Sequence, residues 1–147
     1  MEIFAPFKVS ASAIDAQRKR MNVIASNLAN AQTTRTQAGG PYRRKDVIFS
    51  TIDIGDGKND FKNNFNKEVN LAKGVSVSNI IEDDRPPTMI YDPDHPDADS
   101  AGYVAMPNVN TMEEMTNMML ALRAYEANVT VFNLSKGMYA KTLEIGR

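Results

Sequence analysis

Apolar residues recur along the last quarter of the chain at alternating spacings of three and four, the pattern of a long amphipathic helix. The stripe contains Met115, Met118, Leu122, Tyr125, Val129, Phe132, Lys136, Tyr139 and Leu143, of which only the lysine is charged. It predicts one helix over Thr111 to Arg147, with Thr111 and Glu114 at capping-box spacing. Such a helix is roughly 50 Å long, more than a small domain needs to cover its own core. Part of the stripe is therefore expected to meet another molecule.

A second, thinner stripe near the N-terminus predicts a helix from Ser10 to Ala31. Its apolar positions are Phe7, Ala11, Ile14, Met21, Ile24, Leu28 and Ala31, and Ala25 is a further inward candidate. Two arrangements fit helices at both ends of a chain. One is an antiparallel pair within an ordinary bundle. The other is a coiled coil whose free flanks pack against neighbouring subunits.

Strands are expected between the two helices. The Gly39-Gly40-Pro41 triplet marks a turn, and the run from Tyr42 to Phe49 that follows has the β-branched and aromatic residues of a strand. The segment from Gly74 to Tyr91 predicts two more short strands around Pro86-Pro87. The basic residues Arg43, Arg44 and Lys45 are interpreted as a solvated or intersubunit face, because no other basic cluster adjoins them in sequence.

The segment from Thr51 to Leu71 is polar and rich in Asn, Asp and Gly. This composition is typical of a long loop or a loose hairpin, and Phe61 and Phe65 could anchor either one. The sequence leaves both possibilities open. The segment is also a candidate insertion.

Composition excludes several classes of protein. The chain has 147 residues, 42% of them hydrophobic, and a net charge of −1, whereas a nucleic-acid surface needs a surplus of Lys and Arg. It has no Cys, so a disulfide framework and a thiolate site are both impossible. The first ten residues lack the apolar core of a signal peptide, and no run has transmembrane length. If the protein leaves the cytoplasm, we expect its N-terminus to remain in place.

The segment from Asp92 to Asp99 contains four carboxylates and the chain's only histidine, His95. An EF-hand loop starting at Asp92 would place Pro96 and Tyr103 where oxygen ligands are needed, so calcium binding of that type fails on spacing. Zinc would need ligands from elsewhere in the chain. We interpret the segment as a connector stiffened by proline, with no catalytic, cofactor or metal site.

Two asparagines mark the end of the first predicted helix. Asn27 and Asn30 are poor helix formers that readily bond nearby backbone groups, so they suit a helix end held in one geometry. The run Ser26-Asn27-Leu28-Ala29-Asn30-Ala31-Gln32-Thr33 resembles the signature of the rod and hook proteins of the bacterial flagellum. The preceding run from Ser12 to Arg18 matches as well, although Ile14 stands where Leu is more usual.

Later motifs resemble the proximal-rod branch of that family. They are the runs Tyr42 to Phe49, Tyr91 to Ala98, Gly102 to Asn110, Glu114-Met115 and Arg123 to Val129. The resemblance covers nearly the whole chain outside Thr51 to Leu71, where proximal-rod proteins usually have a shorter segment. It implies a structural subunit that assembles with copies of itself and other rod proteins. It further implies export by the flagellar type III apparatus without a cleaved signal peptide, a periplasmic location, and contact with the rod-to-membrane-ring adaptor.

The predicted fold is mainly α with a small β subdomain, in which the terminal helices form an antiparallel coiled-coil pair. Residues 1–34 and 108–147 would form a discontinuous helical domain, and residues 35–107 a β-rich insert with a polar part at 51–73. The predicted assembly interface comprises Phe7, Ile14, Met21, Leu28, Asn27, Asn30, Met115, Met118, Leu122, Tyr125, Val129, Phe132, Tyr139 and Leu143. The predicted connector comprises Tyr91, Asp92, Pro93, His95, Pro96, Gly102, Tyr103, Pro107 and Asn108.

The predicted function is mechanical: the subunits form a helical tube that transmits torque and encloses the export channel. The methionines around Met115 suit contacts that differ between neighbours, because Met adapts its shape easily. Two other classes remain open from the residues alone. They are a soluble helical adaptor or chaperone, and a carboxylate-rich metal-dependent enzyme.

Overall fold

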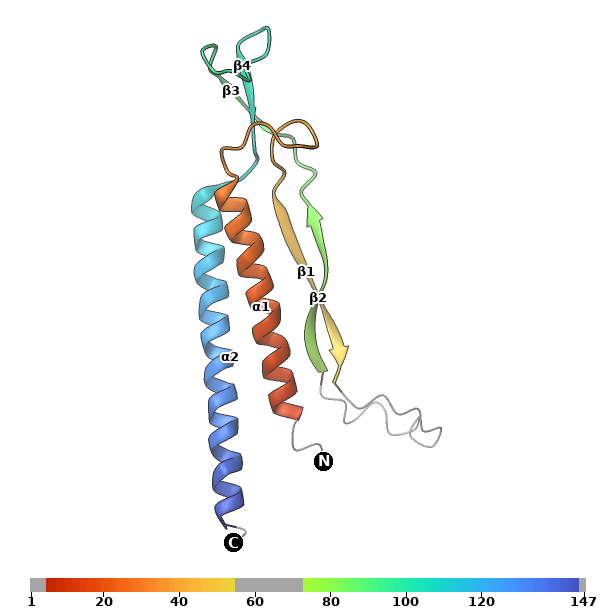
Figure 1. Cartoon of the computed structure of the whole chain (residues 1–147), viewed down its shortest axis with the longest axis vertical. Helices are drawn as coiled ribbons and strands as arrows, with labels where there is room; N and C mark the ends of the chain where they lie inside the picture. Colours follow the sequence, from red (N-terminus) through yellow and green to blue (C-terminus); the bar gives the residue numbers. More distant parts are fainter. Residues whose placement is uncertain (1–4, 55–72, 146–147) are drawn as a thin grey trace, which may run out of the picture. The chain divides into compact units, whose positions relative to one another are not determined.

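The computed structural model describes residues 5–54 and 73–145, which form two helices and four strands. These elements are α1 (Ala5–Ala29), β1 (Lys45–Asp53), β2 (Lys73–Glu82), β3 (Thr88–Tyr91), β4 (Tyr103–Met106) and α2 (Thr111–Ile145) (Figure 1). The predicted class, mainly α with a small β part, is confirmed. The predicted insertion lies almost wholly outside the described residues. Within the described residues, neither helix is long and apolar enough to cross a membrane.

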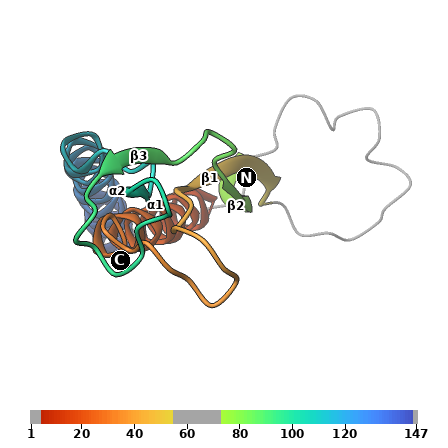
Figure 2. The same ribbon diagram turned by 90° about the horizontal axis from the view of Figure 1, so that it is seen from above.

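The chain divides into two compact units, each built from several segments. One unit contains the described residues of 1–19, 49–78 and 122–147, and the other contains residues 20–48 and 79–121. In each unit a stretch of α1 runs antiparallel to a stretch of α2 (Figures 1 and 2). The predicted division into a helical domain and a β-rich insert stays a prediction.

Helix α1 differs from its predicted bounds at both ends. It begins at Ala5 rather than Ser10, since Pro6 falls in the first turn, where a proline costs no hydrogen bond. It ends at Ala29 rather than Ala31, and the chain leaves it through turns in which Ala31 N donates to Leu28 O at 3.3 Å.

Helix α2 begins at Thr111 as predicted, but the predicted capping box is wrong. Asn110 is the cap: its Oδ1 accepts hydrogen bonds from Met112 N at 3.0 Å and from Glu113 N at 3.3 Å. The Glu114 side chain does not turn back toward the helix start, because it is fully buried against other groups.

The strands form two separate two-stranded sheets, β1 with β2 and β3 with β4. The sequence predicted a strand from Tyr42 to Phe49. Strand β1 begins only at Lys45, so the first three residues of the predicted strand are not part of it. Strand β4 lies in what the sequence suggested was connector, and it pairs antiparallel with β3 from Thr88 opposite Met106 to Tyr91 opposite Tyr103.

Gly74 lets β2 lie close to α1 within the first unit. A Cβ at this position would collide with the side chain of Ile54 and would lie 2.7 Å from Ser12 Oγ. The same Ser12 Oγ accepts a hydrogen bond from Val75 N at 3.1 Å. A glycine is therefore required for this strand to reach the helix.

The described part of the chain buries few apolar side chains completely. They are Ala16, Ile24, Val104 and Ala121, each at most 5% exposed. Ala11 and Ala25, which the sequence suggested were inward, are exposed. Two of these four are alanines, and many of the larger apolar side chains are exposed.

Candidate functional site

A polar junction holds the end of α1 in the second unit, and Asn27 is its centre, only 1% exposed. Asn27 Nδ2 donates to Lys45 O at 2.8 Å and to Glu114 Oε2 at 3.0 Å. Its Oδ1 accepts from Lys45 N at 2.9 Å and from Tyr42 Oη at 3.0 Å. A side-chain amide has two N–H groups and two acceptor sites, so this amide is fully hydrogen-bonded.

Arg44 provides the charge that balances buried Glu114. Its Nε donates to Glu114 Oε1 at 2.8 Å, and its side chain is 12% exposed. Burial alone lowers the pKa of Arg44, but the hydrogen bond and charge of Glu114 outweigh that effect and raise it. The interpretation of Arg43 to Lys45 as a solvated or intersubunit face is wrong for Arg44, because a buried carboxylate requires a partner cation.

The junction joins the last turns of α1, the start of β1 and the first turn of α2. Asn30 bonds nearby backbone as predicted: its Nδ2 donates to Ser26 O at 2.8 Å. The sequence pattern indicated Asn27 but not its partner Glu114, nor Arg44, which pairs with Glu114. The available signal was the position of Glu114, which continues the inner stripe of α2 toward its first turn. The roles of Asn27 and Asn30 in an assembly interface stay predictions.

The inner face of α2 follows a seven-residue repeat. It consists of eight buried or half-buried positions, Glu114, Met118, Ala121, Tyr125, Asn128, Phe132, Ser135 and Tyr139. Successive members are separated by four and three residues, as at the a and d positions of a coiled coil. In the first unit the ring of Phe7 meets Phe132 edge-on at 5.2 Å and stacks on Tyr139 at 5.0 Å.

The predicted stripe therefore straddles two faces of α2. Met118, Tyr125, Phe132 and Tyr139 belong to the inner face, and Val129 is half-buried beside it. The remaining predicted positions, Met115, Leu122 and Leu143, are exposed. On α1, the predicted interface residues Phe7, Ile14, Met21 and Leu28 are all half-buried.

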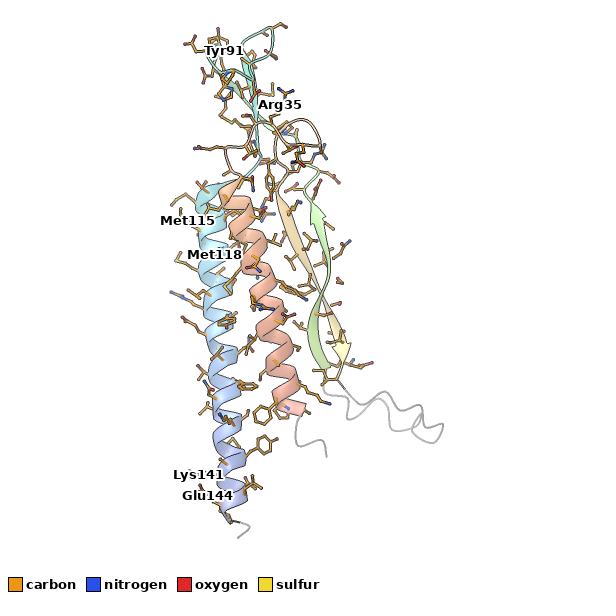
Figure 3. All side chains as sticks on the ribbon, in the orientation of Figure 1. Arg35, Tyr91, Met115, Met118, Lys141 and Glu144 are labelled. Carbon is orange, nitrogen blue, oxygen red and sulfur yellow. The ribbon has the colours of Figure 1, made fainter. Side chains whose placement is uncertain are left out.

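Other large apolar side chains of α2 are also exposed. They are Met112, Met119, Leu120, Val131, Leu134, Met138 and Ile145. Figure 3 labels Met115 and Met118 on neighbouring turns near the start of the helix, and Lys141 and Glu144 near its end. The outer surface of α2 thus carries apolar residues along much of its length.

The predicted connector forms the β3–β4 hairpin and the loop that closes it. The rings of Tyr91 and Tyr103 meet at 5.3 Å across the pair, and Gly102 takes a positive φ of 82° that glycine adopts easily. Asp92 N donates to Gly102 O at 2.9 Å. Pro93 and Pro96 lie exposed in the loop.

The connector then continues into the start of α2. Pro107 is buried, and Asn108 lines a small cavity of about 190 Å³ together with residues 39–44 and 83–87. Apart from Asn108, this lining is formed by the loop before β1 and the loop after β2, and all of these residues belong to the second unit.

Side chains of Asp99 and His95 hold the turns of the loop. Asp99 Oδ1 accepts from Ala101 N at 2.8 Å and from Tyr103 N at 2.9 Å, and His95 Nδ1 accepts from Asp97 N at 3.1 Å. Among the described residues, no group of three or more His, Cys, Asp or Glu side chains is placed to hold a metal ion. The loop is therefore organised by local hydrogen bonds.

Comparison with known proteins covers the whole chain. A family model described as flagella basal body rod protein matches residues 7–36, and one described as flagellar basal body rod FlgEFG protein C-terminal matches residues 100–145. The flagellar basal-body rod protein FlgC of Bacillus subtilis (strain 168) is 46% identical over 152 residues, covering 100% of both chains. The proteins of the same name from Borreliella burgdorferi and Salmonella typhimurium are 43% and 42% identical, covering at least 98% of each chain. With this identity along its full length, the chain belongs to the flagellar basal-body rod protein FlgC family.

Proposed function

We propose that this chain, a structural subunit of the flagellar basal-body rod, is held in the rod by apolar side chains that its own fold leaves exposed. The family is structural, so the chain is not an enzyme, and its rod relatives act as parts of an assembly. The mechanical role proposed here is to pass torque through repeated interfaces around a central export channel. No bond is made or broken in this role.

One observation carries the proposal: many of the larger apolar residues are exposed, and two of the four fully buried apolar residues in the described part of the chain are alanines. Leu122 and Leu143 of α2 are 45% and 76% exposed, whereas the fully buried apolar residues include Ala16 and Ala121. Exposed apolar surface of this extent is typical of a protein–protein contact site. Subunits that meet through heterologous contacts form helical assemblies when the contact does not close into a ring.

The finer parts of the proposal follow from the family. We propose that the protein is exported by the flagellar type III apparatus with its N-terminus intact and that it lies in the periplasmic part of the rod. Its partners would be copies of itself, other rod proteins and the rod-to-membrane-ring adaptor. The adaptor or chaperone role is not favoured by any feature of the site. In the Asp92 to Asp99 loop, the Asp99 carboxylate is engaged in a turn and the Asp97 carboxylate accepts from Thr34 Oγ1.

The test replaces the chromosomal gene with a variant carrying Leu122→Ser and Leu143→Ser. We expect normal protein levels, loss of swimming and no chain in purified basal bodies. The matched control carries Leu122→Met and Leu143→Met, which keeps both sites apolar and should keep motility. Full motility of the serine variant would refute the role of these exposed residues. Fractionation of the same strains tests the periplasmic location.

A further inference from the structure

Two exposed stripes on α2 share the same spacing. The first consists of Met112, Met115 and Met119, which are 73%, 49% and 56% exposed. The second consists of Val131, Leu134 and Met138, which are 49%, 63% and 71% exposed. Each stripe steps by three and then four residues, so each presents one continuous apolar ridge.

The second stripe borders a shallow, open apolar groove on the surface of α2. The groove has a volume of about 670 Å³ and is lined by Thr130, Asn133, Leu134, Gly137, Met138, Lys141, Thr142 and Ile145. A Cβ added at Gly137 would meet no atom within 4 Å, so the groove floor is open at this point. Small residues of this kind let another helix approach closely, and methionine side chains adapt to irregular surfaces.

The seven-residue repeat places the two stripes on opposite flanks of α2. We assign the a position to Met118 and the d position to Glu114, and to the residues seven apart from each. Met112 and Met119 then fall at b, and Met115 falls at e. Val131 and Met138 then fall at g and Leu134 at c. The b/e and c/g flanks lie on either side of the a/d seam that faces α1. Each flank can therefore contact a different neighbour while the seam stays closed.

We propose that the methionine stripe of one copy packs on the Val131 stripe of a second copy, with the two α2 helices parallel and displaced by nineteen residues. This inference rests on the proposed function, because it requires the chain to assemble. Each residue of the second stripe follows its counterpart in the first by nineteen positions, so a single displacement of about 28 Å aligns all three pairs. Lys141 in the groove then comes within about one helical turn of Glu126 of the second copy.

The occupant is a second copy because the two stripes match each other and use different surfaces. A contact between unlike surfaces of identical chains leaves one free stripe on each partner, so it continues from copy to copy. Repetition of the same screw operation keeps all helices parallel, as a rod requires. A face-to-face dimer through one stripe would instead close and stop the assembly.

Cysteine cross-linking tests the register, since the natural chain has no Cys. Tagged Met119→Cys and untagged Met138→Cys chains are produced together in a motile strain, and isolated basal bodies are oxidised. The proposal predicts a disulfide-linked dimer of one tagged and one untagged chain, as does the pair Met112→Cys with Val131→Cys. Disulfides form only where Cα atoms approach within about 7 Å. Within one α2 helix these positions are about 28 Å apart, so the link must join two copies.

Two controls fix the interpretation. Each single variant alone should give no dimer. In the proposed parallel register, residue 112 lies opposite residue 131 of the second copy, so residue 138 is seven residues farther along the helix. This is an axial offset of about 10 Å, and the pair Met112→Cys with Met138→Cys should therefore form no disulfide. A link in this pair would show antiparallel helices and would overturn the proposal.

The remaining outcomes separate the inference from the function on which it rests. Intact rods that contain the variants but form no dimer would refute this contact and leave the rod function standing. A link to a different rod protein in place of the second copy would also refute it. Absence of the natural chain from basal bodies would instead refute the proposed function.

Discussion

Removal of the Glu114 carboxylate should destabilise the chain more than any other single change near the start of α2. In Glu114→Ala, the largely buried Arg44 loses its hydrogen-bonded counter-ion and one N–H of Asn27 loses its acceptor. Breaking a buried ion pair by removing one partner costs about 3–5 kcal/mol. The unpaired amide N–H adds part of the about 1–3 kcal/mol that an unsatisfied buried donor costs. We expect a total near 4 kcal/mol, which lowers Tm by on the order of 10 °C.

The conservative change Glu114→Gln should also destabilise, for a reason specific to this site. The two carboxylate oxygens accept from two different donors, Arg44 Nε and Asn27 Nδ2. A glutamine has only one oxygen, so its amide nitrogen would face one of these donors. The matched control is Glu113→Ala, an exposed acidic residue in the same first turn, which should change stability by about 0.5 kcal/mol or less.

The assay is urea denaturation of the full chain followed by circular dichroism, extended to a double-mutant cycle with Arg44→Ala. The double variant should be less destabilised than the sum of the two single variants by about 1–3 kcal/mol, because it leaves no unpaired charge. Strict additivity, or a Glu114→Ala chain as stable as Glu113→Ala, would refute the assignment of a buried ion pair.

Three further predictions follow from other contacts. Asn110→Ala removes the cap of α2 and should lower the free energy of unfolding by about 1 kcal/mol, whereas Asn110→Ser should restore most of it in the same urea assay. Gly74→Val should separate β2 from α1 and expose the amide of residue 75. Hydrogen exchange at that amide should then be faster, and an unchanged exchange rate would contradict the prediction. The hydrogen bonds from Arg85 lower the pKa of Asp83 to about 2; the resulting stabilisation is present above the ordinary carboxyl pKa and is lost as the pH falls toward 2. NMR titration should give this pKa in the natural chain and a higher pKa in Arg85→Gln, which removes the guanidinium but keeps the hydrogen bond from the backbone N–H of residue 85; equal values in both would contradict the pairing.

The sequence predicted the existence of the helices better than it predicted which side of each faces inward. The spacing of apolar residues identified α2 and its start, but both flanks of the inner seam also carry apolar residues. Hydrophobicity alone therefore could not distinguish inward Phe132 from outward Leu122. The inner face includes Glu114 and Asn128, which no apolar pattern selects.

The polar junction was hidden from sequence reasoning because its members are far apart in the chain. Arg44 and Glu114 are separated by 70 residues, and Asn27 and Glu114 by 87. Neither a basic run nor a helix-start glutamate indicates a long-range partner. Strand β4 was missed for a local reason: its four residues, Tyr103–Met106, are shorter than the pattern needed to recognise a strand between proline-rich segments.

A chain that leaves many of its larger apolar side chains exposed needs another way to fix its own fold. Apolar burial is not directional, so it could not by itself hold the end of α1, the start of β1 and the first turn of α2 in one arrangement. The bonds of Asn27 and the Arg44–Glu114 pair are directional, and each is satisfied by only one arrangement of these three segments. If the proposed function is right, the junction holds the first turn of α2 in place before assembly. The exposed stripes of α2 then bind neighbouring subunits. A Glu114→Ala chain should therefore enter rods poorly even where its exposed stripes are unchanged.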